Sequence, residues 1–360
     1  MRKIRYGVIG SGWRAEFYIR ISKQLNEYFD LAAVLIREKE KGEEFAKKFH
    51  VNIVQTIEQM KQENIEFVVL SIKREIVAEY LPKLYQLEIP VLCETPPSND
   101  EGKLITIWED FNKYKGKIQI AEQYLFQPLY ASWHKAIGEG MIGEVQNINI
   151  SALHGYHASY IMRKFLGIGY ESCKIQGERF HFQVVETGGR DGACYHGNVV
   201  ESPRERLTIK FENGKVGFFD FSFTQYHSYI RTRQLNVQGT KGEIDDLDIR
   251  YIGDENEPIH LQLNRIDLGV YNNQEWTHKG IMLGDQYLYK NPFVGARLND
   301  DEIAIASCLY KMREYIESGV EFYSLREALQ DSYIAVKMEE ALKGNQEEIK
   351  GCKQCWYTND

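Results

Sequence analysis

A glycine-rich turn near the start of the chain constrains the fold more than any other feature of the sequence. Gly10-Ser-Gly12-Trp-Arg-Ala15 directly follows an apolar run, Ile4–Ile9. Apolar residues then recur at helical spacing, at Phe17, Ile21, Leu25 and Tyr28. A strand, a G-x-G-x-x-A turn and a helix in this order are the fingerprint of a dinucleotide-binding βαβ unit. Because the flanking elements fit, we favour cofactor binding over a turn with a structural role only.

Each small residue of the turn has a physical task in such a unit. Gly10 allows the tight turn, and Gly12 lets backbone amides approach a pyrophosphate at the positive end of the helix. Ala15 allows the helix to pack closely on the sheet. These tasks predict that the turn holds the diphosphate of a nicotinamide dinucleotide.

Short apolar runs alternate with amphipathic stretches up to about residue 121. The further predicted strands are Leu31–Ile36, Phe67–Ser71, Val91–Cys93 and Ile118–Ala121. The predicted helices between them are Glu38–Phe49, Ile57–Glu63, Ile76–Leu87 and Gly102–Lys115. This alternation is typical of an α/β fold in which parallel strands are joined by crossover helices. We therefore expect residues 1–122 to form a Rossmann domain with a doubly wound parallel sheet.

The pattern changes after residue 122, where strand-like runs predominate. A helix is predicted at about Leu129–Gly138, followed by strands at Val145–Leu153, Glu178–Val185, Arg206–Phe211, Val216–Phe223 and Arg233–Gln238. Glu212-Asn-Gly214 and Gly239-Thr-Lys-Gly242 predict hairpin turns, because Asn and Gly tolerate positive φ. Helices near Asp300–Ser318 and Leu325–Leu342 end the chain. We expect residues 123–360 to form an α+β domain that carries the substrate side.

Composition excludes several classes of partner. The chain of 360 residues carries 44 Lys+Arg against 52 Asp+Glu, and the two signs are interspersed, so a nucleic-acid partner is not expected. No stretch approaches the roughly 18 apolar residues of a membrane span, and no signal-peptide core follows the first residues. We expect a cytoplasmic protein that does not bind membranes. Its six cysteines are scattered and expected to be reduced, with Cys352 and Cys355 favoured as an ordinary tail over a metal or redox pair.

The end of the second predicted strand bears on the choice of cofactor. NAD-preferring sites usually place a carboxylate there to bind the adenosine ribose, but this chain has Ile36. The adjacent Arg37, helped by Lys39, can pair with a 2′-phosphate instead. We expect NADP or NAD as the cofactor, with NADP preferred. The alternative is that Arg37 is a solvated surface charge.

Seven further segments resemble the motifs of one family, in the right order. They are Val91-Leu-Cys-Glu94-Thr95-Pro96, Ala121-Glu-Gln-Tyr124-Leu-Phe-Gln-Pro128, Ile142-Gly-Glu-Val145, Gly155-Tyr-His157 with Met162-Arg-Lys-Phe-Leu-Gly167, Gly239-Thr-Lys-Gly242 and Tyr323-Ser-Leu-Arg-Glu-Ala328. With the glycine-rich turn they resemble the Gfo/Idh/MocA family of NAD(P)-dependent oxidoreductases. The resemblance implies a second domain with a large open mixed sheet, assembly into a homodimer or homotetramer through that sheet, and hydride transfer to or from a CH-OH carbon of a sugar, inositol or polyol.

The chain departs from the family at two catalytic positions. Where the family motif V-x-C-E-K-P has lysine, this chain has Thr95, whose hydroxyl does not titrate near neutral pH. Where the family has an aspartate four residues before its histidine, this chain has Leu153. His157 remains at the histidine position and is the predicted acid–base group, with a structural role as the alternative.

The resemblance also assigns the remaining site residues. Glu94 and Pro96 correspond to cofactor-contacting positions, and Gln123 and Tyr124 to polar contacts for nicotinamide or substrate, although Tyr124 can equally serve only in packing. His154 is a second substrate candidate. The predicted cofactor residues are Gly10, Ser11, Gly12, Trp13, Arg14, Ala15, Arg37, Ser71, Glu94, Pro96 and Gln123, the catalytic ones are His157 and Thr95, and no metal site is predicted.

Three functions fit these residues. The first is an NAD(P)-dependent oxidoreductase that acts on a small polar metabolite with the cofactor as hydride carrier. The second is a catalytically impaired sensor or scaffold that binds the dinucleotide, which Thr95 and Leu153 would permit. The third is a C=N (imine) reductase. A polar glycine-rich cluster, Gly188–Asp191 with His196, is interpreted as a surface loop rather than a site.

Overall fold

The computed structural model describes the chain except residues 1, 268, 270–276, 345–346 and 358–360. The chain divides into two compact units. The first contains the residues up to Tyr130 together with Arg265–Gly280 and Lys290–Leu329, and the second contains Ala131–Asn264, Ile281–Tyr289 and the residues from Gln330 onward. The boundary that we predict between residues 122 and 123 stays a prediction, since neither unit is continuous in sequence.

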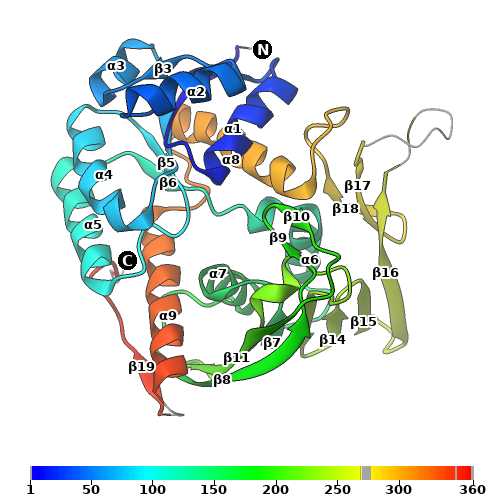
Figure 1. Cartoon of the computed structure of the whole chain (residues 1–360). Helices are drawn as coiled ribbons and strands as arrows, with labels where there is room; N and C mark the ends of the chain where they lie inside the picture. Colours follow the sequence, from blue (N-terminus) through cyan, green and yellow to red (C-terminus); the bar gives the residue numbers. More distant parts are fainter. Residues whose placement is uncertain (1, 268, 270–276, 345–346, 358–360) are drawn as a thin grey trace. The chain divides into compact units, whose positions relative to one another are not determined.

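The first unit is built on a six-stranded parallel sheet. Its strands are β1 (Ile4–Ile9), β2 (Phe29–Leu35), β3 (Ile53–Val54), β4 (Phe67–Leu70), β5 (Val91–Cys93) and β6 (Ile118–Ile120), in the order β3-β2-β1-β4-β5-β6. The helices are α1 (Trp13–Gln24), α2 (Lys39–Phe49), α3 (Ile57–Gln62), α4 (Val77–Gln86), α5 (Glu101–Tyr114) and, from late in the sequence, α8 (Asp300–Ser318). Helices α4 and α5 lie side by side, as do α1 and α8 (Figure 1). This strand order confirms the predicted doubly wound Rossmann sheet.

The core of the first unit explains why its strands are nearly continuous apolar runs. Strands of a parallel sheet are covered on both faces, so both sets of side chains are buried. Tyr6 of β1 lies between Phe67, stacked at 5.7 Å, and Phe29, edge-on at 6.4 Å between ring centroids. Its hydroxyl donates a hydrogen bond to the carbonyl of Tyr18 on α1 at 2.7 Å. This hydrogen bond ties the aromatic core to the middle of α1.

The second unit is built on a large mixed sheet, for which eleven strands are described. Its order is β18-β17-β16-β15-β14-β13-β7-β12-β11-β8-β19. The bounds are β7 (Val145–Ser151), β8 (Cys173–Val185), β11 (Val199–Phe211), β12 (Val216–Phe221), β13 (Gln234–Gly239), β14 (Gly242–Asp245), β15 (Asp248–Ile252), β16 (Pro258–Ile266), β17 (Gly280–Leu283), β18 (Gln286–Lys290) and β19 (Ile349–Gly351). β7 and β12 are parallel, whereas β7 and β13 are antiparallel. The large mixed sheet that the resemblance implied is confirmed.

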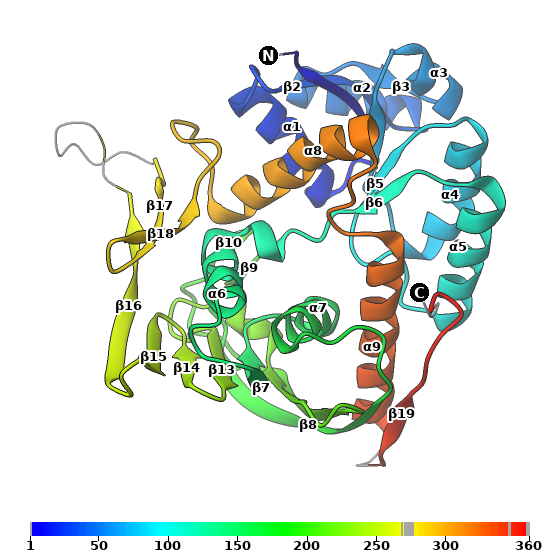
Figure 2. The same cartoon turned by 180° about the vertical axis from the view of Figure 1, so that it is seen from behind.

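One face of this sheet is covered and the other is open. Along β7, Ile148 and Ile150 are buried, whereas Asn147 and Asn149 line a cavity on the opposite face. The helices of the second unit are α6 (Pro128–Gly138), α7 (Gly155–Leu166) and α9 (Leu325–Lys343), and α7 lies over the sheet near α9 (Figure 2). Successive side chains of a strand point alternately to the covered face and to the open face, because the side-chain period of a strand is two residues.

Two long strands begin earlier than predicted. β8 begins at Cys173 rather than Glu178, and β11 begins at Val199 rather than Arg206. Their first halves carry polar side chains on the open face, so hydrophobic periodicity marks them weakly. The strand predicted to Phe223 ends at Phe221, and Phe223–Gln225 form a short 3₁₀ helix, η3, with a capping box between Ser222 and Gln225. The hairpin predicted at Glu212-Asn-Gly214 is confirmed by the antiparallel pairing of β11 with β12.

Three further features bear on function. Within the described residues, no helix is both long and apolar enough to cross a membrane. The described His, Cys, Asp and Glu side chains form no cluster of three suited to a metal ion. The six cysteines all lie in the described part of the chain, and none of them forms a disulfide.

Candidate functional site

The glycine-rich turn crosses the sheet where its strand order reverses. Gly10 has φ +126°, and a Cβ there would lie 1.9 Å from the carbonyl oxygen of Ser71 at the end of β4. Its amide donates to the carbonyl of Leu35 at the end of β2. Both the backbone angle and the close approach therefore require glycine at this position. The turn is held over the carboxyl ends of β2 and β4, the usual place for a ligand in an open α/β sheet.

The start of α1 faces open space. Gly12 is the residue before α1, in an extended conformation, and a Cβ built on it would meet no atom within 4 Å. Since glycine has no side chain to cap the helix, the first amides of α1 are left for an external acceptor. A helix N-terminus with uncapped amides favours an anion such as a phosphate.

A cavity of about 590 Å³ surrounds this turn in the first unit. It brings together six of the predicted cofactor residues, namely Gly10, Ser11, Gly12, Arg14, Arg37 and Ser71. Its other lining residues are Ile9, Leu35, Ile36, Glu38, Lys41, Ile72, Lys73, Ile76 and Tyr80. The predicted residues outside this lining are Trp13, Ala15, Glu94, Pro96 and Gln123. Sequence reasoning missed Lys41, Lys73 and Tyr80, although the rule that ligands lie at the carboxyl ends of strands points to the segment after β4.

The charge of this cavity is strongly positive. Its lining contains four cationic side chains, Arg14, Arg37, Lys41 and Lys73, and a single carboxylate, that of Glu38. NAD-preferring sites carry an acid at the position of Ile36. The buried, apolar Ile36 side chain cannot accept a hydrogen bond from a ribose hydroxyl. The excess of cations suits a ligand with several phosphate charges.

A buried polar network lies behind the turn. The Tyr18 hydroxyl donates to Oε1 of Glu94 at 2.5 Å, and Nε of Arg14 lies 3.7 Å from Oε2. Burial raises the pKa of Glu94, and the Arg14 guanidinium opposes that shift. Nη1 of Arg14 is buried, and no acceptor among the described residues lies within hydrogen-bond distance of it. An orphaned guanidinium nitrogen at the edge of the cavity fits a bound dinucleotide as the missing acceptor.

Glu122 is a buried carboxyl that sequence reasoning did not single out. Its Oε1 accepts a hydrogen bond from the amide of Tyr124 at 3.1 Å. Desolvation raises its pKa from 4.5 to about 8, so at neutral pH the group is mostly protonated. The neighbouring Gln123 and Tyr124 are also buried, and the Tyr124 ring packs edge-on against Tyr130 at 5.2 Å. Their predicted contacts to nicotinamide or substrate stay predictions.

The second unit holds the histidine candidates together at the start of α7. His154 precedes the helix and His157 lies in its first turn, with ring centroids 4.7 Å apart. His157 is 6% exposed and also contacts the Tyr156 ring at 5.2 Å. The amide of His154 donates to the Tyr226 hydroxyl at 2.8 Å. Leu153, at the family's aspartate position, is fully buried.

A buried ion pair fixes α7 against α9. Nη1 of Arg163 donates to Oδ1 of Asp331 at 2.9 Å, and the two side chains are 1% and 0% exposed. The Ser159 hydroxyl donates to the same oxygen at 3.3 Å. Nε and Nη2 of Arg163 both donate to the carbonyl of Gly169. The helix that carries His157 is therefore anchored by a buried, hydrogen-bonded charge pair.

The remaining candidates are Thr95 and the glycine-rich cluster. Thr95 follows β5 in the first unit, whereas His157 belongs to the second. The glycine-rich cluster interpreted as a surface loop forms a small exposed hairpin, β9 (Gly188–Gly189) with β10 (Gly192–Ala193).

Comparison with known proteins supports the assignment of the first unit. The model of an oxidoreductase family with an NAD-binding Rossmann fold, GFO_IDH_MocA, matches residues 4–121. No curated protein sequence matches the chain.

Solved structures resemble the chain over nearly its whole length. An oxidoreductase from Agrobacterium radiobacter in complex with NAD+, L-tartaric acid and magnesium is 14% identical, with a TM-score of 0.68 and 97% of this chain and 98% of that chain covered. An oxidoreductase from Sinorhizobium meliloti is 13% identical, with a TM-score of 0.67 and 97% and 100% covered. The apo scyllo-inositol dehydrogenase from Lactobacillus casei is 13% identical, with a TM-score of 0.67 and 97% and 98% covered. At these identities the similarity shows a shared two-part fold.

Proposed function

We propose that this chain transfers hydride between a nicotinamide cofactor and a small polar metabolite, because residues 4–121 match the model of an oxidoreductase family with an NAD-binding Rossmann fold. The metabolite class we favour is a sugar, inositol or polyol, oxidised or reduced at a CH-OH carbon. A scyllo-inositol dehydrogenase among the structural neighbours supports this choice. The observation that carries the proposal is the cationic cavity around Gly10 and Gly12, with its uncapped helix N-terminus.

The cofactor supplies the hydride chemistry, and the chain positions it. Gly10, Ser11 and Gly12 present backbone to the diphosphate, and the spare nitrogen of Arg14 donates to it. We assign the adenosine end to Arg37, Lys41 and Lys73, whose charge favours the 2′-phosphate of NADP over NAD. Ser71, which also lines the cavity, completes this half of the site.

His157 is the proton-transfer group in this proposal. Neutral imidazole accepts a proton and imidazolium donates one at ordinary pH, which the Thr95 hydroxyl cannot do. The side chain is held by the anchored α7 and by contacts with His154 and Tyr156. Thr95 donates or accepts a single hydrogen bond, and Tyr124 and His154 contact the substrate.

We also infer a homo-oligomer, a homodimer or homotetramer, in the cytoplasm. The open face of the second unit's sheet exposes aromatic side chains, Phe180, Phe182 and Phe218, among polar ones. Burial of these rings against a second copy would remove exposed apolar area. Light scattering checks this inference, and a mass of 42.0 kDa at micromolar concentration would contradict it.

Cofactor titration followed by a turnover screen tests the function. The thermal shift on adding NAD(H) and NADP(H) measures binding, and absorbance of reduced nicotinamide measures turnover on a panel of sugars, inositols and imines. Gly12→Val should fold normally and lose cofactor binding, because its side chain enters the space of the ligand. Gly138→Val, equally free of neighbours within 4 Å, is the matched control. Tight binding without turnover on any panel member would favour a sensor, and turnover on imines alone would favour a C=N reductase.

A further inference from the structure

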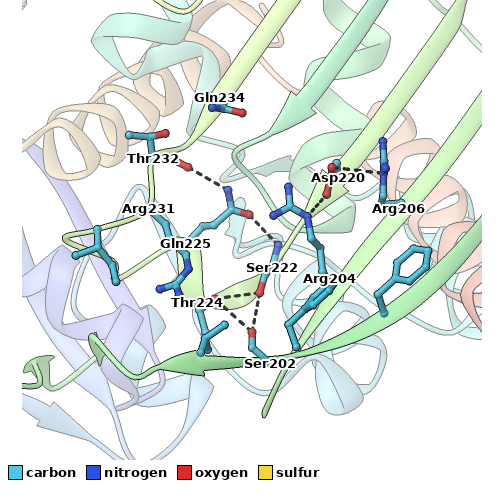
Figure 3. A pocket seen from close by; sticks show the side chains of 14 residues that line it. Ser202, Arg204, Arg206, Asp220, Ser222, Thr224, Gln225, Arg231, Thr232 and Gln234 are labelled. Carbon is cyan, nitrogen blue, oxygen red and sulfur yellow. Dashed lines mark hydrogen bonds and ion pairs between the residues drawn. The ribbon is translucent and has the colours of Figure 1, made fainter. Parts of the chain in front are cut away.

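A cavity of about 770 Å³ lies on the open face of the second unit's sheet, with walls from β8, β11, β12 and the segment that leads from η3 to β13 (Figure 3). Phe180, Phe182 and Arg231 line it. A second copy on this face, as inferred above, buries the two rings, so the cavity is part of that contact and not a separate site. Residues 349–357 contribute nothing to its lining and lie at the β19 edge of the sheet instead.

This last described segment of the chain is held at two points. β19 pairs antiparallel with β8 and lies beside α9 (Figures 1 and 2). After it, Trp356 is fully buried, and its Nε1 donates a hydrogen bond to Oε1 of Gln330 on α9 at 2.9 Å. The stretch that contains Cys352 and Cys355 lies between these two points.

One side chain of α9 contacts both ends of this stretch. The Tyr333 hydroxyl accepts a hydrogen bond from the amide of Cys352 at 2.9 Å, and the Tyr333 ring packs edge-on against the Trp356 ring at 6.2 Å between centroids. The Gln354 side chain donates to the carbonyl of Cys352 at 3.2 Å. Residues 352–356 therefore form a compact loop on α9, which we call the cysteine loop.

Both thiols of the cysteine loop are accessible. Cys352 and Cys355 are exposed. Three other cysteines are buried, and burial raises the pKa of their thiols: Cys93, Cys173 and Cys308. Because the thiolate is the nucleophile in disulfide exchange, these three are poor reactants. The partly exposed Cys194 follows the small β9–β10 hairpin, in a different part of the chain.

The spacing of the two exposed thiols fits a disulfide. A disulfide needs Cα atoms about 4.4–6.8 Å apart, and a chain that folds back within four residues brings its ends to less than about 7 Å. Cys173 is a poorer partner for Cys352, because it lies opposite Gly351 in the sheet and its thiol is buried, whereas that of Cys352 is exposed. The partner of Cys352 is therefore Cys355.

We propose that Cys352 and Cys355 are a redox site, a dithiol that converts reversibly to an intrachain disulfide by exchange with a small disulfide such as oxidised glutathione. The thiolate of one cysteine attacks a sulfur of the small disulfide, forms a mixed disulfide and displaces one thiolate. The thiolate of the other cysteine attacks the protein sulfur of the mixed disulfide and displaces the second. Each displaced thiolate takes up the proton that a protein thiol has lost, so two protein thiols are oxidised and one small disulfide is reduced.

The docking of the loop favours this redox site over the ordinary tail that the sequence favours. The loop also contacts the stretch of α9 that anchors the histidine helix. Gln330 and Tyr333, which hold the loop, flank Asp331, the partner of Arg163 on α7. All of these residues belong to the second unit, so the redox site does not depend on the cofactor.

Tryptic mapping of the full chain tests the pairing, because Lys353 lies between the two cysteines. The reduced chain is treated with oxidised glutathione, its remaining thiols are alkylated with iodoacetamide, and trypsin cuts after Lys350 and Lys353. We expect mass spectrometry to find the peptide with Cys352 joined to the peptide with Cys355, and dithiothreitol to separate them. Two separate peptides, alkylated or carrying glutathione, would overturn the proposal, as would a disulfide from either cysteine to another.

Single serine variants test the second exchange step. Cys352→Ser and Cys355→Ser each lack the thiol that resolves the mixed disulfide, so the remaining cysteine should retain at least about tenfold more glutathione than in the parent. Cys194→Ser is the control and should form the joined peptides as the parent does. Equal glutathione retention in the parent and in both loop variants would rule out the exchange between Cys352 and Cys355.

Tyr333→Phe tests the part that the docked loop plays. It removes the hydroxyl that binds the Cys352 amide and keeps the ring against Trp356. A looser loop lowers the effective concentration of one thiol at the other, so the ratio of disulfide to dithiol in a fixed glutathione buffer should fall about threefold or more. Tyr251→Phe on β15 is the control. An unchanged ratio in Tyr333→Phe would contradict the proposal that docking on α9 builds the redox site.

Discussion

The dinucleotide cavity and the histidine end of α7 differ in whether backbone groups or side chains form them. The first consists mainly of backbone: a turn with φ +126° at Gly10 and the uncapped start of α1. The second consists of side chains, His154 and His157, held by Tyr226 and by the Arg163–Asp331 pair from distant parts of the sequence. A site made of backbone needs a short contiguous motif, whereas a site made of side chains can change its residues while the fold persists.

The largest expected effect tests whether the two regions act independently. His157→Ala should lower turnover by about 10²–10⁴-fold, since it removes the proton-transfer group that we propose. It should leave the dissociation constant of the dinucleotide unchanged, because Gly10, Gly12 and Arg37 belong to the other unit. Steady-state kinetics and calorimetry measure the two quantities. His260→Ala, a histidine paired with Asp248 on the same sheet, is the control. Equal turnover in His157→Ala would make that histidine structural.

A second variant tests the anchor of the histidine helix. Asp331→Ala leaves the Arg163 guanidinium fully buried without its carboxylate, and we expect a loss of about 3–5 kcal/mol in the free energy of unfolding. Urea denaturation of the full chain measures it. Glu340→Ala on the same helix breaks the partly exposed pair with Lys337, in which the carboxylate is 43% exposed, and should cost less than about 1 kcal/mol. Similar losses in both variants would contradict the assigned role of the buried pair.

The next prediction concerns pH. Glu122 has a pKa raised from 4.5 to about 8 by burial, so the folded chain keeps a proton that the unfolded chain releases between these values. Its contribution to stability is full below pH 4.5 and is lost as pH rises through about 8.

Glu122→Gln stays neutral at every pH and should remove this slope, which is at most about 1.4 kcal/mol per pH unit. Relative to the parent, the variant should therefore gain stability between about pH 5 and about pH 9, as followed by thermal unfolding. Glu58→Gln is the comparison variant with the opposite sign: backbone hydrogen bonding lowers the pKa of that exposed carboxyl, so its substitution should not remove the loss of stability with rising pH. A pH profile of Glu122→Gln parallel to that of the parent would show that Glu122 ionises normally.

The smallest effect sharpens the description of the dinucleotide cavity. Arg37→Ala should weaken NADP(H) binding by about tenfold through loss of a charged hydrogen bond and leave NAD(H) binding nearly unchanged. Calorimetric titration with both cofactors measures the ratio. Lys39→Ala is the control, since Lys39 does not line the cavity. Tighter binding of NAD than NADP by the parent would remove the role given to Arg37.

The sequence predicts the first region better than the second for a physical reason. The glycines at Gly10 and Gly12 indicate a tight turn with close backbone approach, and the buried parallel strands are visible in the sequence as apolar runs. Lys41, Lys73 and Tyr80 are ordinary surface residue types that only the fold brings to the cavity. Glu122 carries no mark of burial in the sequence, because its pKa is raised by desolvation in the folded chain, a shift that the Tyr124 amide and Arg14 oppose.

In the second unit, the sequence predicts the strands and the cavity less well for a different reason. Residues 174–178 and 201–206 alternate in a sheet with one open polar face, so half of each strand resembles a solvated segment. The cavity lined by Arg231 and Phe182 draws on four separate stretches of chain. No local pattern could predict it.

The buried pair between Arg163 and Asp331 bears on how fast the site can evolve. Its two side chains are 1% and 0% exposed, so the charges are shielded from water. Residues near His157 can therefore be replaced while this pair stays intact, so the side chains at the start of α7 are free to change while Arg163 and Asp331 are under strong constraint.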